Sequence, residues 1–367
     1  MRDGIEDKTA AETARPKLTY PFEQAPAAGE AVDVAPGVKW LRMPLGGPLG
    51  FINVWAIREG DGWAIVDTGL SGVETRDGWR AAFAGPLEGR PVTRVFVTHM
   101  HPDHIGMAGW LTRKFDCQLW ITRLEFVTCR SLALDTGREA PAVALRFYKA
   151  AGWDEDALDQ YKAKFGGFGR GIHVLPDSFH RLNDGDRIRI GDHEWEVVVG
   201  SGHSPEHASL YCRDLKLMIS GDQVLPKISS NVSLFPTEPE ADPLTDWLTS
   251  LAHIKDRVPD DVLVLPAHNE PFHGLHARLD HLIGGHERGL ARLAEALAEP
   301  KRVTDVFSVL FRRRIDENLL GLATGESLAH LNCLRGRGLA VRERDAAGVD
   351  WYRAVDAPPQ GELSRRD

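Results

Sequence analysis

The sequence predicts a layered body of strands and helices, of the α/β or α+β class, followed by a smaller helical part. Three observations lead to this prediction. Short apolar segments rich in β-branched residues recur up to about residue 265. Groups of these segments are followed, twice over, by helical patterns. From about residue 277 the pattern changes to helices, and the chain then ends in two short strands.

The elements of the body follow from local patterns, taken in chain order. Gly60-Asp61-Gly62 lies between two apolar runs and predicts a hairpin turn. The run Arg94-Val95-Phe96-Val97-Thr98 predicts the end of a buried strand. The expected strands are 50–57, 63–67, 92–98, 186–190, 195–199, 209–212, 217–220 and 262–265, and the expected helices are 75–84, 106–115 and 243–256.

The chain divides into four parts by composition. Residues 1–30 are polar and rich in Ala and Pro, which predicts an N-terminal arm. Residues 31–276 form the expected main domain, and the helix-prone, aromatic stretch 123–175 is expected to be an insertion in it. In residues 277–367 we expect helices at 291–297 and 327–336, with Thr304 as the N-cap of a third. Two strands over 339–355 follow, and this order is typical of a winged-helix-like domain.

Composition excludes several classes of protein. With 367 residues, 43% of them hydrophobic and 26% charged, the chain is neither disordered, collagenous nor a coiled coil. Its net charge of −9 argues against binding to nucleic acid or to an anionic membrane. The four cysteines form no CxxC pair, so no thiolate zinc site is expected. The N-terminus has no apolar run of signal-peptide type, and we therefore expect a cytoplasmic protein with no membrane segment.

The densest group of polar residues directly follows a predicted buried strand. In Thr98-His99-Met100-His101-Pro102-Asp103-His104, the first two histidines are two residues apart. In an extended segment this spacing puts both imidazoles on the same side. Asp103 and His104 follow where the chain turns toward a helix, and can face a second point nearby. Three imidazoles and a carboxylate this close together are costly to bury without a cation. The motif therefore predicts a metal site.

Three further polar residues each lie just past an apolar strand. His203 follows the strand that ends in Glu196-Val197-Val198-Val199, Asp222 follows Ile219-Ser220-Gly221, and His268 follows Leu265-Pro266-Ala267. Each alone is weak evidence for a ligand. Together with the first cluster they complete a site for two metal ions.

The motif THMHPDH resembles the HxHxDH signature of the metallo-β-lactamase-fold hydrolases. His203, Asp222 and His268 resemble the later ligands of that superfamily, in order, and Asp67-Thr68-Gly69 its early strand-end motif. The resemblance covers about residues 35–275 and implies an α+β, four-layer αββα fold. The absence of a cysteine ligand is similar to glyoxalase II-like and lactonase-like members. The segment after residue 277 resembles the winged-helix tail of one branch.

The resemblance also implies a division of labour among the ligands. His99, His101 and His203 would hold one divalent ion, while Asp103, His104 and His268 would hold the other. Asp222 would bridge the two ions together with a hydroxide, Asp103 would orient that nucleophile, and Asp67 would support a ligand. The favoured metal is Zn²⁺, with Mn²⁺ or Fe²⁺ as alternatives.

The expected function is binuclear hydrolysis of a small-molecule ester, lactone or thioester by a metal-bridging hydroxide. A metal-dependent endoribonuclease is one alternative, motivated by the tail and by Arg312-Arg313-Arg314, which otherwise would form a solvated helix face. A mononuclear iron persulfide dioxygenase using His99, His203 and Asp222 is another. Tails of this kind often pack across a homodimer, so a dimer is also expected.

Overall fold

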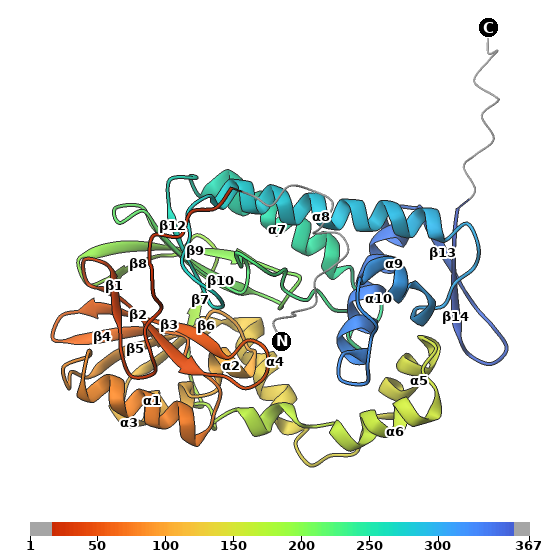
Figure 1. Cartoon of the computed structure of the whole chain (residues 1–367). Helices are drawn as coiled ribbons and strands as arrows, with labels where there is room; N and C mark the ends of the chain where they lie inside the picture. Colours follow the sequence, from red (N-terminus) through yellow and green to blue (C-terminus); the bar gives the residue numbers. More distant parts are fainter. Residues whose placement is uncertain (1–16, 356–367) are drawn as a thin grey trace, which may run out of the picture.

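The computed structural model describes residues 17–355. Residues 1–16 of the predicted N-terminal arm and residues 356–367 of the predicted C-terminal domain lie outside the described range. Two β-sheets face each other, and helices cover the outer face of each (Figure 1). This is the α+β, αββα arrangement that the sequence predicts.

The first sheet has seven strands in the order β1 to β7. Neighbours from β1 to β4 are antiparallel, and those from β4 to β7 are parallel. The strands are β1 (Val32–Ala35), β2 (Val38–Pro44), β3 (Phe51–Glu59), β4 (Gly62–Val66), β5 (Val92–Phe96), β6 (Gln118–Thr122) and β7 (His180–Leu182). Three helices connect strands of this sheet: α1 (Val73–Ala84) lies between β4 and β5 in the chain, and α2 (Pro102–Ile105) and α3 (Ala108–Phe115) lie between β5 and β6. Helices α1 and α3 pack on its outer face.

The second sheet has five strands in the order β12-β11-β10-β9-β8. Only β11 and β12 are parallel. The strands are β8 (Arg187–Ile190), β9 (His193–Gly200), β10 (His207–Cys212), β11 (Leu217–Gly221) and β12 (Leu263–Pro266). Helix α7 (Pro243–Arg257) packs on β9 and begins after Asp242, whose side chain accepts a hydrogen bond from the backbone N–H of Thr245 at 3.1 Å.

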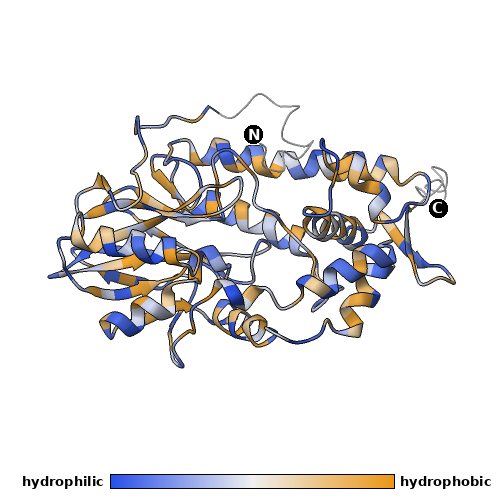
Figure 2. Cartoon of the chain, turned by 60° about the horizontal axis from the view of Figure 1, so that its bottom comes forward, coloured by the Kyte–Doolittle hydropathy of each residue, from blue (hydrophilic) through white to orange (hydrophobic). Residues whose placement is uncertain are grey.

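Three apolar clusters hold the layers together. Strand alternation produces them: Ile52 and Val54 of β3 face helices α1 and α3, whereas Trp55 of the same strand faces the second sheet. Between the sheets, Trp55 meets Trp40 and Trp195, all fully buried. The helices show hydrophilic and hydrophobic stretches in alternation, as amphipathic helices on a core do (Figure 2).

The stretch 123–175 is helical, as predicted, and it reaches the C-terminal part of the chain. It contains α4 (Arg123–Leu134), α5 (Ala142–Ala150), α6 (Glu155–Lys164) and the 3₁₀ helix η2 (Phe168–Gly171). Figure 1 places α5 and α6 below α10, on the side away from the sheets. The indole N–H of Trp153 donates to the hydroxyl of Thr324 at 2.9 Å, which joins the two parts.

The C-terminal part consists of a long helix, short helical turns, a second long helix and a hairpin. These are α8 (Leu275–Ala296), η3 (Thr304–Val306), α9 (Phe307–Leu310), α10 (Leu320–Gly336), β13 (Ala340–Arg344) and β14 (Asp350–Ala354). The predicted terminal strand pair is confirmed. Among the described residues, no helix has the length and apolarity that crossing a bilayer requires.

Several details differ from the sequence-based expectations. The predicted helix 291–297 is only the end of α8, and the predicted helix 327–336 begins earlier, at Leu320. Thr304 is not an N-cap, because it lies inside the 3₁₀ turn η3, which Val303 precedes. Arg312, Arg313 and Arg314 are not on a helix face, since α9 ends at Leu310.

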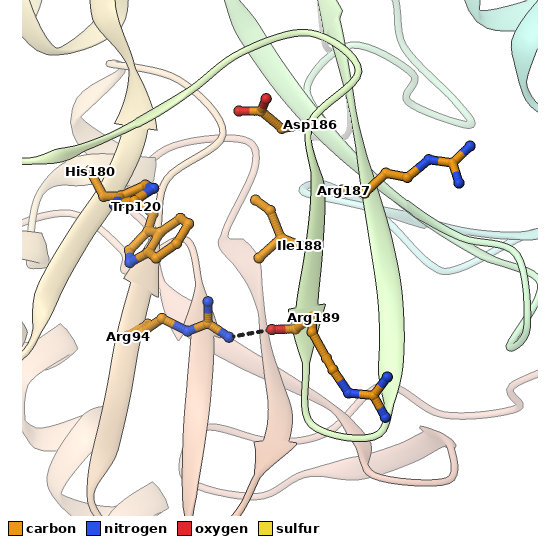
Figure 3. Close-up of a pocket in the computed structure, with 7 residues that line it drawn as sticks. All are labelled: Arg94, Trp120, His180, Asp186, Arg187, Ile188 and Arg189. Atoms are coloured by element: carbon orange, nitrogen blue, oxygen red, sulfur yellow. Dashed lines mark hydrogen bonds between the residues drawn. The ribbon is translucent and has the colours of Figure 1, made fainter.

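The edge strands β7 and β8 of the two sheets border a hollow of roughly 410 Å³ (Figure 3). Trp120 and His180 stack on one side of it, with ring centroids 3.5 Å apart. The Arg94 guanidinium crosses between the sheets and donates to the carbonyl oxygen of Arg189 at 2.7 Å. Figure 3 shows the Arg189 side chain pointing away from Trp120. No residue lining this hollow is one of the predicted ligands, so it is separate from the predicted metal site.

Candidate metal centre

The topology brings the predicted ligands to one edge of the sandwich. β4 and β5 are parallel neighbours, so Asp67 and His99, which follow them, leave the first sheet at the same edge. β11 and β12 are also parallel neighbours, and Asp222 and His268 follow their ends. His203 follows the end of β9 in the same sheet. Residues far apart in sequence therefore meet because each follows a strand.

The first cluster contains His99, His101, His203 and Asp222, with one donor atom of each lying within 4.8 Å of the others. The His99 Nε2 and His101 Nδ1 atoms are 2.9 Å apart. The Nε2 atom of His203 is 3.4 Å from Oδ2 of Asp222. Three imidazoles and one carboxylate around one point form a donor set that suits a divalent ion such as Zn²⁺.

The second cluster contains Asp103, His104 and His268, again within 4.8 Å. The His268 Nε2 atom is 3.4 Å from Oδ2 of Asp103. Asp222 also belongs to this side, since its Oδ1 is 3.5 Å from His268 Nε2 and its Oδ2 is 3.6 Å from His104 Nε2. The Asp222 carboxylate therefore lies between the two clusters, and the seven predicted ligands come together as two groups.

Burial lowers the pKa of two imidazoles of the first cluster, those of His99 and His101. It holds the pKa of His99 well below the ordinary value, and the neighbouring His104 and His101 lower it further. Burial, with His203 beside it, lowers the pKa of His101 to about 3. Neutral imidazole is the form that binds a metal ion, so these residues need no deprotonation near neutral pH.

The second cluster has the opposite electrostatics. Burial opposes protonation of His104, but the carboxylates of Asp67, Asp103 and Asp222 outweigh it and raise the pKa of His104 well above the ordinary value. Burial would raise the pKa of Asp103, yet His104 and His268 lower it to about 2. The carboxylates thus favour positive charge at this point, and a divalent cation and protons compete for it.

Buried donor atoms without a hydrogen-bond partner test whether the residues fit metal ions. His104 Nε2, His203 Nε2 and Asp222 Oδ1 are all buried and make no hydrogen bond. Buried polar atoms are almost always satisfied, and leaving one unsatisfied costs about 1–3 kcal/mol. These three atoms belong to the two clusters just described, so the residues present fit bound metal.

The far side of each of three ligand imidazoles meets an acceptor that fixes its tautomer. His104 Nδ1 lies 2.8 Å from Oδ2 of Asp67. His268 Nδ1 lies 3.2 Å from the carbonyl oxygen of Phe51, and His203 Nδ1 lies 2.7 Å from that of Asn231. Since these oxygens only accept, each Nδ1 carries a proton, and Nε2 is the ring nitrogen left to bind a metal ion. Asp67 therefore orients the imidazole of His104, one of the predicted ligands.

His207, the first residue of β10, contacts the backbone of the predicted ligand Asp222. Burial lowers the pKa of His207 to about 3, so its ring is neutral. Its Nε2 accepts a hydrogen bond from the backbone N–H of Asp222 at 3.1 Å. Gly221, just before Asp222, has φ +50°, and a Cβ there would collide with this ring.

Sequence reasoning missed Glu125, which joins two ligand loops. This carboxylate at the start of α4 is fully buried, and burial raises its pKa. One oxygen accepts from the backbone N–H of Met100 and the other from that of Glu206, both at 2.8 Å. No local pattern marks Glu125, because its partner Glu206 lies far along the chain.

Asn53 was missed as well, and it anchors the loop of His268. Its side-chain oxygen accepts from the indole N–H of Trp40 at 2.8 Å. Its amide nitrogen donates to the carbonyl oxygens of Pro266 at 2.8 Å and Asn269 at 2.7 Å. A single polar residue inside the apolar strand β3 is the only sequence signal of this role.

Comparison with known families decides the classification. The family model described as "Metallo-beta-lactamase superfamily" matches residues 47–268, a range that contains all seven predicted ligands. The chain belongs to the metallo-β-lactamase superfamily. A second model, "Metallo-beta-lactamase-like, C-terminal domain", matches residues 290–355.

Solved structures agree with this superfamily assignment over most of the chain. A β-lactamase domain protein from Burkholderia ambifaria is 39% identical, with a TM-score of 0.83, over 92% of this chain and 98% of that one. A metallo-β-lactamase family protein from Thermus thermophilus is 25% identical, with a TM-score of 0.73, over 88% of this chain and 100% of that one.

Three named relatives are less similar to this chain than the Burkholderia ambifaria protein. "Probable metallo-hydrolase YqgX" of Bacillus subtilis is 26% identical over 63% of this chain and 90% of its own length. The hydroxyacylglutathione hydrolase of Roseobacter denitrificans is 27% identical over 48% and 66%. The acyl-coenzyme A thioesterase MBLAC2 of Gallus gallus is 27% identical over 60% and 73%. This chain is thus a member of a metallo-hydrolase superfamily, and its His/Asp clusters are those of a metal-binding protein.

Proposed function

We propose that the protein is a binuclear metal-dependent hydrolase of a small ester, lactone or thioester. The observation that carries the proposal is the position of Asp222, whose carboxylate lies within 3.6 Å of ligand nitrogens in both clusters. Two cations held by the two clusters would share this carboxylate, as in two-metal hydrolytic sites.

In the proposed reaction a water oxygen attacks the carbonyl carbon, and the bond from that carbon to oxygen or sulfur breaks. One water proton ends on the leaving oxygen or sulfur. Bound divalent ions would acidify the water and polarise the carbonyl under attack. Asp103, with its side chain 19% exposed, has the access to solvent that a group orienting this water needs.

The donor set supports zinc as the metal. His99, His101, His203 and Asp222 would hold one ion, and Asp103, His104 and His268 the other, with Asp222 shared. Nitrogen and carboxylate donors suit Zn²⁺, and also Mn²⁺ and Fe²⁺. The names of two relatives, a hydroxyacylglutathione hydrolase and an acyl-coenzyme A thioesterase, favour a thioester among the three substrate classes.

The test is elemental analysis of the purified protein, combined with an ester, lactone and thioester panel before and after chelation. We expect about two zinc or manganese ions per chain, and hydrolysis that chelation abolishes and zinc restores. Full activity in the chelated protein would refute metal-dependent hydrolysis. One iron per chain, with oxygen uptake on a persulfide and no hydrolysis, would instead assign the protein to iron oxygenases.

A further inference from the structure

We infer that Glu326 on α10 is a positioning residue for the ligand His203, acting through Asn231. The inference rests on the proposed metal centre and extends it to the C-terminal part of the chain. The connecting segment is residues 229–234, here named the strap, which leaves the second sheet after Asp222 and passes beside α10.

The strap fixes the orientation of His203. The Nδ1 atom of His203 lies 2.7 Å from the carbonyl oxygen of Asn231. Because that oxygen can only accept, the ring presents the lone pair of Nε2 to the cluster. Any movement of the Asn231 carbonyl therefore rotates this ligand or exposes the wrong tautomer.

Glu326 holds Asn231 in place. The Asn231 amide nitrogen donates to Oε2 of Glu326 at 2.8 Å, and it also lies 3.5 Å from the carbonyl oxygen of Leu322. The Asn231 side-chain oxygen accepts from the hydroxyl of Ser233. Glu326 is 5% exposed, and a hydrogen bond to a buried carboxylate is among the stronger ones.

The backbones of the strap and of α10 meet closely at the same place. The N–H of Leu234 donates to the carbonyl oxygen of Gly325 at 3.0 Å. A Cβ on Gly325 would lie 2.5 Å from the Ser233 hydroxyl oxygen, so glycine is required for this approach. The turn of α10 that carries Glu326 is thus in direct contact with the strap.

A second chain of contacts links the same turn to Asp222. His330 Nδ1 lies 2.8 Å from the carbonyl oxygen of Glu326, so its Nε2 accepts and faces Nδ1 of His286 at 3.4 Å. His286 Nε2 then lies 3.4 Å from the hydroxyl of Ser229. Next to Ser229, the Ser230 hydroxyl donates to the carbonyl oxygen of Asp222. All these polar groups are buried or half-buried.

The consequence is that the C-terminal part of the chain helps to form the metal centre. Breaking the Glu326 to Asn231 contact removes one of the contacts that hold the strap, and the acceptor of the His203 ring is then held less firmly. Loss of a partner that orients a ligand typically costs about 10- to 100-fold in metal affinity. For Glu326, one contact further away, we expect about tenfold, confined to the ion that His203 binds.

The test measures the zinc affinity of four metal-depleted proteins, each in competition with a chromophoric chelator. These are the wild type, Glu326→Leu, Glu326→Gln and Asn332→Ala. Asn332 is a matched control, because it is also on α10, is 5% exposed and donates to the carbonyl oxygen of Ala241 at 2.9 Å, but contacts no ligand. We expect about tenfold weaker binding of one zinc in Glu326→Leu and a smaller loss in Glu326→Gln, which keeps an acceptor. We expect less than about a twofold change in Asn332→Ala.

The outcomes separate this inference from the proposed function. A wild type that binds no zinc would refute both. A wild type that binds two zinc ions, with Glu326→Leu indistinguishable from Asn332→Ala, would refute only the positioning role. If Glu326→Leu does not fold, Asn231→Ala breaks the same contact while keeping the backbone carbonyl, and the same loss of about tenfold is expected. Urea unfolding of each variant shows whether lost affinity merely follows lost stability.

Discussion

Asp67 and His104 form a buried pair in which the carboxylate Oδ2 lies 2.8 Å from the imidazole Nδ1. The other carboxylate oxygen of Asp67 accepts from the backbone N–H of Thr98 at 2.8 Å. Asp67 itself has φ +60°, in the left-handed region, directly after β4. One side chain thus joins the ends of two parallel strands and orients a ligand that they carry.

Replacing Asp67 by Asn tests this orientation. Asn tolerates a positive φ and keeps an oxygen for Thr98, but its NH₂ group no longer accepts from His104. We expect zinc affinity at the second cluster to fall by about 10- to 100-fold, as measured by titration of the metal-depleted protein. Asp116→Asn is the control, because Asp116 also has a positive φ, of 50°, and is exposed at the end of α3. Equal zinc affinities in the two variants would contradict the prediction.

Glu125→Gln tests whether one carboxylate holds the two ligand loops together. Both oxygens of Glu125 accept backbone N–H groups, whereas Gln offers a single oxygen and turns an NH₂ group toward the other N–H. We expect the free energy of unfolding to fall by about 1–3 kcal/mol, measured in urea. Glu139→Gln, at an exposed residue, should change it by less than about 0.5 kcal/mol. An unchanged midpoint in Glu125→Gln would show that the loops do not depend on this contact.

The sequence indicated the clustered His and Asp side chains better than the residues that support them, for a physical reason. His99, His101, Asp103 and His104 are local in sequence and follow a buried strand, so spacing alone places them together. Glu125, Asn53 and Asn231 act through partners far along the chain, and a single polar residue in an apolar stretch gives no period or motif. Their roles depend on tertiary contacts that no local pattern contains.

Strand β2 is absent from the strands expected from the sequence, which begin at residue 50. In β2, Val38 and Trp40 pack between the sheets, whereas Leu41 and Met43 pack toward the helices on the other face, and all four are buried. Lys39 and Arg42 are half-buried, so the strand is apolar on both faces and shows no clean alternation of apolar and polar residues. The N-cap prediction at Thr304 was wrong for another reason. Thr is a common N-cap residue, but Thr304 lies inside the 3₁₀ helix η3, and α9 after it is a single short turn.

Gly221→Ala tests the close approach beside Asp222. The added Cβ would collide with His207 Nε2 and lie 2.9 Å from the Thr98 hydroxyl oxygen, and φ +50° is strained for Ala. We expect a loss of more than about 2 kcal/mol in the free energy of unfolding and weaker zinc binding. Gly137→Ala measures the backbone strain alone, since Gly137 has φ +82° and open space around it. Equal losses in both variants would mean that crowding at His207 contributes nothing.

The His286 and His330 pair predicts a specific loss of stability in acid. Burial, with His330 beside it, lowers the pKa of His286 to about 3 from an ordinary 6.5. Between these values the unfolded chain binds a proton that folded His286 does not, so the free energy of unfolding falls as the pH drops below about 6.5. From about pH 7 to about pH 5 this single group accounts for about 2 kcal/mol.

His286→Gln removes that group while keeping a neutral polar side chain, so its stability should depend less on pH. We expect the difference in unfolding free energy between wild type and His286→Gln to shrink by about 2 kcal/mol from about pH 7 to about pH 5, measured by urea denaturation at each pH. His253→Gln, at an exposed position on α7, should parallel the wild type. If His286→Gln also parallels the wild type, His286 is protonated in the folded protein at the lower pH. A protonated His286 would also have no lone pair on Nε2, which faces the Ser229 hydroxyl at 3.4 Å.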